Sequence, residues 1–258
     1  MSDKSKSFEE QKKVLVSLER ELHIPELREK LENYINTVDE KYRKLNILKQ
    51  ERKALKETIG EQRNIYESVD VPFKYPKGQG NAQLRKEYLE TLMNNDSAVV
   101  NARAQLEITE ADIEELQAEI DLIEADISVA YHLDELNHAR FKFIASNNMG
   151  SYESTRRKLL EIEAYYKVDE VAMGIRRHMD EIMPDKEKLW GLQKKLSALI
   201  KNNADNKVKD DLNDEIEELK KRIALKNKQL AMLKRTLLWH ASRISLLANC
   251  TYTSTISR

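Results

Sequence analysis

The middle of the chain carries its most regular pattern, for residues 99–130 read VVNARAQLEITEADIEELQAEIDLIEADISVA. Apolar side chains recur there at alternating steps of three and four, which is the spacing of helices that wind around each other in coiled coils. The pattern holds for more than four heptads, so we expect one long helix with a long partner. The predicted core positions are Leu106, Ile113, Leu116, Ile120, Ile123 and Ile127.

The same spacing returns near the end of the chain, over residues 207–248. It also runs through residues 27–59, where Lys41 and Arg52 interrupt it. Polar residues in such a seam weaken a coiled coil but fix its register. We expect the helix over 207–248 to pair with the central helix. Its predicted core positions are Leu219, Ile223, Leu230, Leu233 and Leu237.

The charges of these two helices are opposite in sign. Residues 104–139 contain eleven acidic side chains and neither Lys nor Arg, whereas the chain after Glu218 contains nine Lys or Arg and no acid. Flanking charges select partner and orientation in coiled coils. The pattern therefore predicts that the two helices pair with each other, within one chain or between two subunits.

Composition agrees with an all-α fold. Only 6 Gly and 4 Pro occur in 258 residues, and 34% of the residues are charged, which suits long exposed helices better than sheets and tight turns. We expect long antiparallel coiled-coil helices that form an elongated bundle or hairpin. The predicted segments are N-terminal helices (1–67), a loop (68–80), a central acidic helix region (81–145), connecting helices (152–203), a basic helix (207–248) and a flexible tail (249–258).

Several residues mark the expected helix ends. Pro25 suits the first turn of a helix, Asp96 or Asn95 suits an N-cap, and Pro184 is expected to end one helix before another starts at Asp185. Residues 202–206, which read NNADN, are typical of a turn between helices.

Other properties of the chain argue against several classes of protein. The single Cys250 has no partner for an intrachain disulfide, and no apolar run approaches the ~18 residues that span a bilayer. A formal net charge of −1 predicts no bulk attraction to nucleic acid or anionic membrane. We expect a cytoplasmic protein that has no membrane association.

No set of residues predicts an active site, a metal site or a cofactor site. His132, Glu135 and His138 share one helix face, and Glu135 with His138 has the spacing of half a di-iron site. A second such motif is required, and no other histidine has a Glu three residues before it. The glycines lack the phosphate-loop pattern. We expect no catalytic residue, no metal and no cofactor.

The charged helices allow two nucleic-acid-related alternatives. The acidic helix could mimic a DNA backbone and so occupy the cleft of a host nuclease or defence enzyme. The basic helix could instead bind phosphates. The candidate contacts for such binding are Lys220, Lys221, Arg222, Lys228, Lys234 and Arg235.

Residues 78–89, GQGNAQLRKEYL, are followed by the Asn95-Asp96 break and the long acidic helix. Over residues 75–142 this arrangement resembles small phage-encoded helical coiled-coil proteins. The resemblance implies a place among phage recombination and replication genes, in the host-cell cytoplasm. The helices outside it would equally suit a eukaryotic kinetochore, tethering or cytoskeletal subunit.

These observations favour a non-enzymatic adaptor or scaffold that mediates protein–protein interaction, with a phage recombination or replication accessory as its specific form. The alternatives are the acidic inhibitor and the nucleic-acid binder. The expected partners are proteins of unknown identity or a second copy of the chain, with nucleic acid less favoured. The pattern leaves the biological process open.

Overall fold

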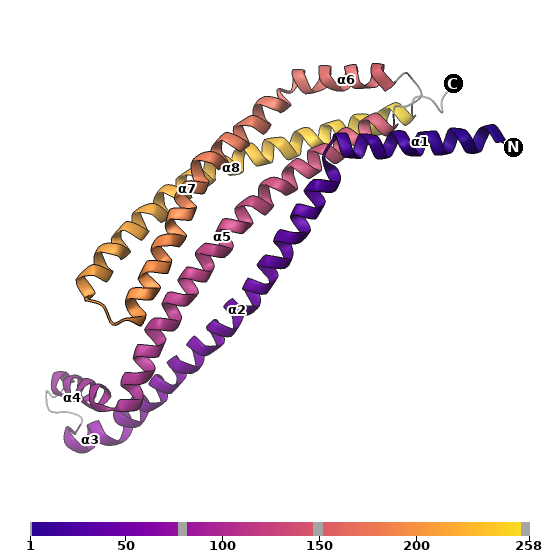
Figure 1. Ribbon diagram of the computed structural model, residues 1–258. Helices are drawn as coiled ribbons and strands as arrows, with labels where there is room; N and C mark the ends of the chain where they lie inside the picture. Colours follow the sequence, from indigo (N-terminus) through magenta and orange to yellow (C-terminus); the bar gives the residue numbers. More distant parts are fainter. Residues whose placement is uncertain (1, 77–81, 147–151, 254–258) are drawn as a thin grey trace. The chain divides into compact units, whose positions relative to one another are not determined.

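The computed structural model of the chain confirms the all-α prediction. It describes residues 2–76, 82–146 and 152–253, and no strand occurs within these ranges. The helices in chain order are α1 (Ser2–Glu21), α2 (Ile24–Ile65), a π-helical turn (Tyr66–Asp70), α3 (Val71–Lys74), α4 (Ala82–Asn95), α5 (Ser97–Ser146), α6 (Tyr152–Tyr165), α7 (Val168–Lys201) and α8 (Asn206–Thr253) (Figure 1).

Short polar breaks separate most of these helices. His23, Lys167 and Asn203 adopt positive φ angles of 53°, 54° and 51° at the α1–α2, α6–α7 and α7–α8 junctions, which ends the preceding helix. Asp96 caps α5 as predicted, because its Oδ1 accepts hydrogen bonds from the backbone N–H groups of Ala98 at 2.8 Å and Val99 at 3.3 Å.

The prediction that Pro184 ends a helix is wrong. α7 continues from Val168 to Lys201 with Pro184 inside it. A proline within a helix costs about 3 kcal/mol, but the apolar face of α7 is buried on both sides of it, at Ile182 and Leu189. The break falls earlier instead, at Lys167.

The predicted loop over 68–80 and tail over 249–258 are both partly helical. The π-helical turn and α3 extend the helical chain to Lys74, and Val71 is buried against Leu89 and Met93 of α4. α8 continues to Thr253. Residues 77–81, 147–151 and 254–258, and the side chain of Cys250, lie outside the described part of the chain.

The chain forms two compact units, and each combines pieces of several helices rather than one run of sequence. Unit 1 comprises Met1–Val38, Asp121–Glu187 and Leu219–Arg258, and unit 2 comprises Asp39–Ile120 and Lys188–Glu218. The predicted segments follow the sequence, whereas α2, α5, α7 and α8 each contribute to both units.

The core of unit 1 is built from α5, α7 and α8 with one residue each from α1 and α6. Leu230 and Leu237 lie in this core, Leu233 packs partly buried against it, and Leu219 and Ile223 are also buried. The predicted Ile123 and Ile127 are half-buried. The other buried members are Leu18, Leu136, Ala139, Phe143, Ile144, Leu159, Val168, Ile175, Met179, Ile182, Ala241, Ile244 and Ala248.

Two smaller cores lie among the described residues of unit 2. In one, Leu45 of α2 packs with Ile113 and Ile120 of α5, and Leu116 lines its edge. The second joins α3, α4 and the start of α5. Lys41, which interrupts the predicted seam, turns its Nζ to Glu119 Oε1 at 2.6 Å, so the seam carries a polar link there. Leu106 is half-buried.

The contacts between α5 and α8 in unit 1 run in the same direction along both helices. Ser128 contacts Lys234 and, further along, Lys142 contacts Ser245. The expectation that these two helices are antiparallel is therefore wrong for this pair. The reason is α7, which returns along both of them before α8 begins: Lys186 contacts Asp121 of α5, and Asp185 contacts Lys226 of α8 (Figure 1).

Candidate functional site

The basic side chains of α8 divide into two groups. Arg222 donates from Nε and Nη2 to the two carboxylate oxygens of Asp185, at 3.1 and 2.8 Å. Lys234 donates to Ser128 Oγ at 2.9 Å. Lys220 is half-buried. Two of the six predicted nucleic-acid contacts, Arg222 and Lys234, thus have partners within the fold, and a third, Lys220, is partly buried, although the Arg222 side chain stays 54% exposed.

The other three, Lys221, Lys228 and Arg235, are exposed and follow one another at steps of seven. Within the described residues, none of these three cations has an ion-pair partner. They lie in one line along α8, since residues seven apart fall on the same side of a helix.

Large apolar side chains alternate with these cations. Leu225, Met232, Trp239 and Leu246 are 63%, 69%, 47% and 56% exposed. They too are seven residues apart, and we call these four residues the outer stripe. Each lies two positions after a heptad position of the inner face, such as Leu237 before Trp239. Two residues turn a helix by about 200°, so the stripe lies away from the buried face, although Leu246 at its end also lines a groove between α5 and α8.

Sequence reasoning missed this second face because it assigned α8 one seam only. A signal was present: two sets of apolar residues repeat every seven positions in α8, two residues out of phase. The inner set is Ile223, Leu230, Leu237 and Ile244, and the outer set is the outer stripe.

Trp239 is the residue of the outer stripe with the most ring contacts. Its indole meets the Tyr166 ring edge-on, with 5.5 Å between centroids, and the Arg243 guanidinium lies 5.1 Å from the Trp239 ring centroid. Such contacts hold an aromatic side chain in one orientation while leaving part of its surface free. Trp239 is therefore preorganised and about half-exposed.

His240 lies next to Trp239 but faces the interior. Its side chain is buried, and neither ring nitrogen has a hydrogen-bond partner within the described residues. Burial lowers the pKa of His240 because the charged imidazolium loses its hydration. The neutral ring packs against Tyr166, at 5.7 Å between centroids.

Two lysines form polar links inside unit 1. The Lys186 Nζ donates to the Asp121 carbonyl oxygen at 2.9 Å. Burial lowers the pKa of Lys186, although the carboxylates of Asp121 and Glu124 act in the opposite direction. Burial also lowers the pKa of Lys234, and the positive charge of Lys186 adds to this effect. Both amines are held by α5, so they connect helices.

The acidic side chains of α5 are neutralised mostly by helices other than α8. Lys41 and Lys56 of α2 pair with Glu119 and Glu110 at 2.6 and 2.7 Å, and Lys201 of α7 pairs with Asp112 at 2.8 Å. From α8, Lys209 reaches Glu107 at 3.3 Å. Lys209 precedes the basic part of α8, so these four ion pairs do not involve the predicted basic segment after Glu218.

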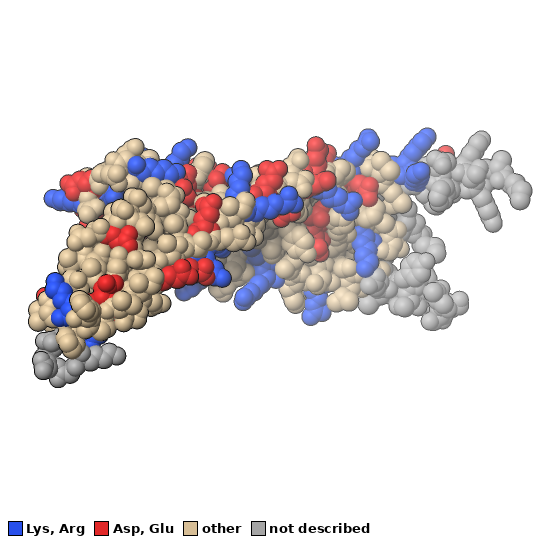
Figure 2. Space-filling model, turned by 90° about the horizontal axis from the view of Figure 1, so that it is seen from below, with Lys and Arg blue, Asp and Glu red and all other residues tan. Residues whose placement is uncertain are grey.

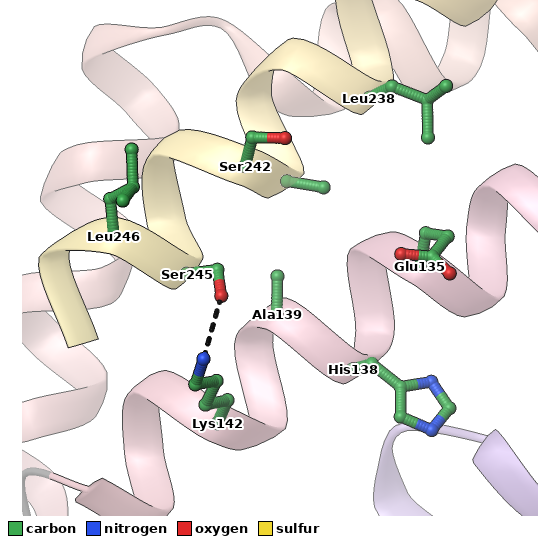
Figure 3. Close-up of a pocket in the computed structure, with 9 residues that line it drawn as sticks. Glu135, His138, Ala139, Lys142, Leu238, Ser242, Ser245 and Leu246 are labelled. Atoms are coloured by element: carbon green, nitrogen blue, oxygen red, sulfur yellow. Dashed lines mark hydrogen bonds between the residues drawn. The ribbon is translucent and has the colours of Figure 1, made fainter. Parts of the chain in front are cut away.

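A groove of about 430 Å³ lies between α5 and α8, and Figure 3 shows the side chains that line it. Ala139 and Lys142 face Ser242 and Ser245 across it, and Lys142 Nζ donates to Ser245 Oγ at 3.2 Å. A catalytic Ser–Lys pair also needs free backbone N–H groups beside the serine to stabilise an oxyanion. Ser245 lies inside a helix, where those groups are occupied, so the contact is a link between helices.

The histidine motif of α5 does not gather into a metal site. His132 Nδ1 contacts the Ser128 carbonyl oxygen at 2.5 Å, and His138 Nδ1 lies 3.2 Å from Asp134 Oδ1. Among the described residues, no three His, Cys, Asp or Glu side chains are placed to hold a metal ion together.

Across the face shown in Figure 2, positive and negative side chains are interspersed. This face therefore presents no broad field of one sign. None of the described helices contains an apolar stretch long enough to cross a bilayer. Comparison with protein families, curated proteins and solved structures gives no match for this chain.

Proposed function

We propose that this chain is a non-enzymatic coiled-coil adaptor or scaffold, which binds a protein partner through the outer stripe of α8. In this proposal the buried heptad faces hold an elongated helical bundle together, and the outer stripe is the surface left for the partner. The resemblance over residues 75–142 adds the more specific form of the proposal, a phage recombination or replication accessory in the host-cell cytoplasm.

The exposure of the outer stripe carries this proposal. Single exposed apolar residues are ordinary on protein surfaces, but four large ones repeated at heptad spacing on one side of a helix favour an interaction site. Leu225 to Leu246 spans about 31 Å of helix at 1.5 Å per residue. The line has the heptad spacing that a partner helix needs, whereas the groove between α5 and α8 and the histidine motif offer no comparable chemistry.

The test compares matched variants in affinity purification from the native host, followed by mass spectrometry. Met232→Ser with Leu246→Ser removes two members of the outer stripe. Met173→Ser with Leu160→Ser removes the same residue types at exposed positions of α7 and α6, where the side chains are 56% and 63% exposed.

We expect a stoichiometric partner with the wild-type chain and the α6–α7 variant, and its loss with the stripe variant. Equal recovery from all three proteins would refute the proposal.

Nucleic-acid binding is the second candidate function, favoured by the line of free cations Lys221, Lys228 and Arg235. It predicts an affinity for DNA that falls steeply with salt, because phosphate contacts release counterions. The acidic inhibitor is favoured less, since α2, α7 and α8 supply counter-charges to the acids of α5. It predicts competition with DNA for a nuclease and no binding of DNA by the chain itself.

A further inference from the structure

We propose that the outer stripe binds an acidic amphipathic helix of a protein partner, packed on α8 in coiled-coil register. This inference rests on the proposed adaptor function and adds the chemical class of the partner.

The spacing of the surface is that of a helix-binding seam. Residues 221, 225, 228, 232, 235, 239, 242 and 246 follow one another at alternating steps of four and three, and all eight are exposed. The apolar residues occupy one heptad position and the cations Lys221, Lys228 and Arg235 the other. This is the pattern in which a second helix can insert its side chains between those of the first.

The seam is too narrow to suit a bilayer surface. The neighbouring exposed positions on its other side are polar, at Gln229, Thr236 and Arg243. Helices that lie in a membrane interface carry a broad apolar face, at least about 100° wide. A line one side chain wide is instead the contact that a single partner helix covers.

Charge selects the kind of helix. α8 contains no acidic residue after Glu218, and the seam carries Lys221, Lys228 and Arg235 with Arg243 beside it. A second copy of α8 would bring like charges together, which coiled-coil pairing rejects. A partner helix with Glu or Asp at the facing positions would complement these four cations.

Trp239 is the expected anchor of this contact. Tryptophan and arginine are enriched among the residues that contribute most to binding, and Tyr166 and Arg243 already hold the indole in place. A side chain that is ordered before binding loses less entropy when the partner arrives.

Two synthetic four-heptad peptides test the charge requirement. Both carry Leu at the apolar heptad positions, and the flanking positions are Glu in the acidic peptide and Lys in the basic one. The protein used is the full chain with Trp190→Phe. The chain has two tryptophans, so this change leaves Trp239 as the single one. Binding is followed by Trp239 emission and by the anisotropy of a dye on the peptide. We expect saturable binding of the acidic peptide only.

A charge reversal gives the sharper comparison. Lys228→Glu with Arg235→Glu should weaken binding of the acidic peptide roughly tenfold or more and create binding of the basic peptide, since two attractive pairs become repulsive. Arg157→Glu with Lys158→Glu changes the same amount of charge at exposed positions of α6, and should leave both affinities unchanged. Circular dichroism verifies that both variants remain helical.

Three results would overturn the inference. One is equal binding of both peptides. Another is a dimer in sedimentation experiments that is lost with Met232→Ser and Leu246→Ser, which would make a second copy the occupant. The third is Trp239 emission that responds to vesicles of anionic phospholipid and not to peptide.

The failure of this inference differs from failure of the adaptor function. A natural partner that is lost with the stripe variant but retained with the charge reversal would support the adaptor function and refute the inference that the partner helix is acidic. A natural partner retained by both variants would refute the proposed adaptor function of the outer stripe itself.

Discussion

Leu237→Ala tests whether the inner face of α8 carries the stability of unit 1. The Leu237 side chain is fully buried among α5, α7 and α8. Its truncation loses about 2–3 kcal/mol of transfer free energy, and the cavity adds to this, so the free energy of unfolding should fall by about 3–4 kcal/mol. At about 2–4 °C per kcal/mol for a chain of this size, the melting temperature should fall by about 10 °C.

Leu246→Ala is the matched control, because it makes the same chemical change on the opposite side of the same helix. Leu246 is 56% exposed, so its truncation should change the free energy of unfolding by no more than about 0.5 kcal/mol. Urea unfolding followed by Trp239 emission in the Trp190→Phe background reports on unit 1, which contains Trp239 but not Trp190. Equal losses for the two variants, or a loss below about 1 kcal/mol for Leu237→Ala, would refute the assignment of the two faces.

Three further predictions concern two buried polar side chains and one glycine inside the helices. The neutral His240 ring is favoured in the folded state, so the unfolded chain binds more protons below about pH 6.5. Stability should therefore fall as the pH falls from there towards the lowered pKa of His240. His240→Leu should remove this loss in urea titrations at pH 7.5 and 5.5, and a persistent loss would contradict the role of His240. Lys186→Met should leave stability unchanged or raise it by ~1 kcal/mol at pH 7. The lowered pKa of Lys186 predicts that the wild-type chain gains stability as the pH rises towards ~10.4, where the unfolded lysine also loses its proton, and the variant should lack this gain. A large destabilisation in calorimetry would contradict this. Gly60→Ala, for which no atom lies within 4 Å of the added Cβ, should raise stability by about 0.5–1 kcal/mol in calorimetry through helix propensity, and a lowered melting temperature would exclude an open site there.

Heptad spacing and composition predicted the all-α fold, and capping and turn residues predicted the breaks near residues 23–25, 96 and 202–206, because these features follow from local chemistry. A buried face repeats with the turn of its helix, as at Leu230 and Leu237, and a cap such as Asp96 acts on its own backbone neighbours. Pro184 shows where local rules stop. Its cost is local, but the packing of α7 that offsets this cost comes from residues distant in sequence.

The heptad pattern also could not predict the direction of α5 relative to α8. Heptads specify which face of a helix is buried and leave its orientation open, and here the intervening α7 makes the two helices run the same way. The outer stripe was missed for a related reason. Leu237 and Trp239 belong to equally regular heptad sets, and only the packed structure distinguishes the buried set from the exposed one.

The most direct test of the account places a photo-crosslinking benzoylphenylalanine at position 232 of the outer stripe, where the native Met232 is 69% exposed. Position 173 of α7, where the native Met173 is 56% exposed, is the control. Irradiation is carried out in cells of the native host. The account predicts a crosslinked protein partner from position 232, none from position 173, and an acidic helical segment at the crosslinked peptide. Crosslinks of equal yield from both positions, or none from position 232, would contradict it.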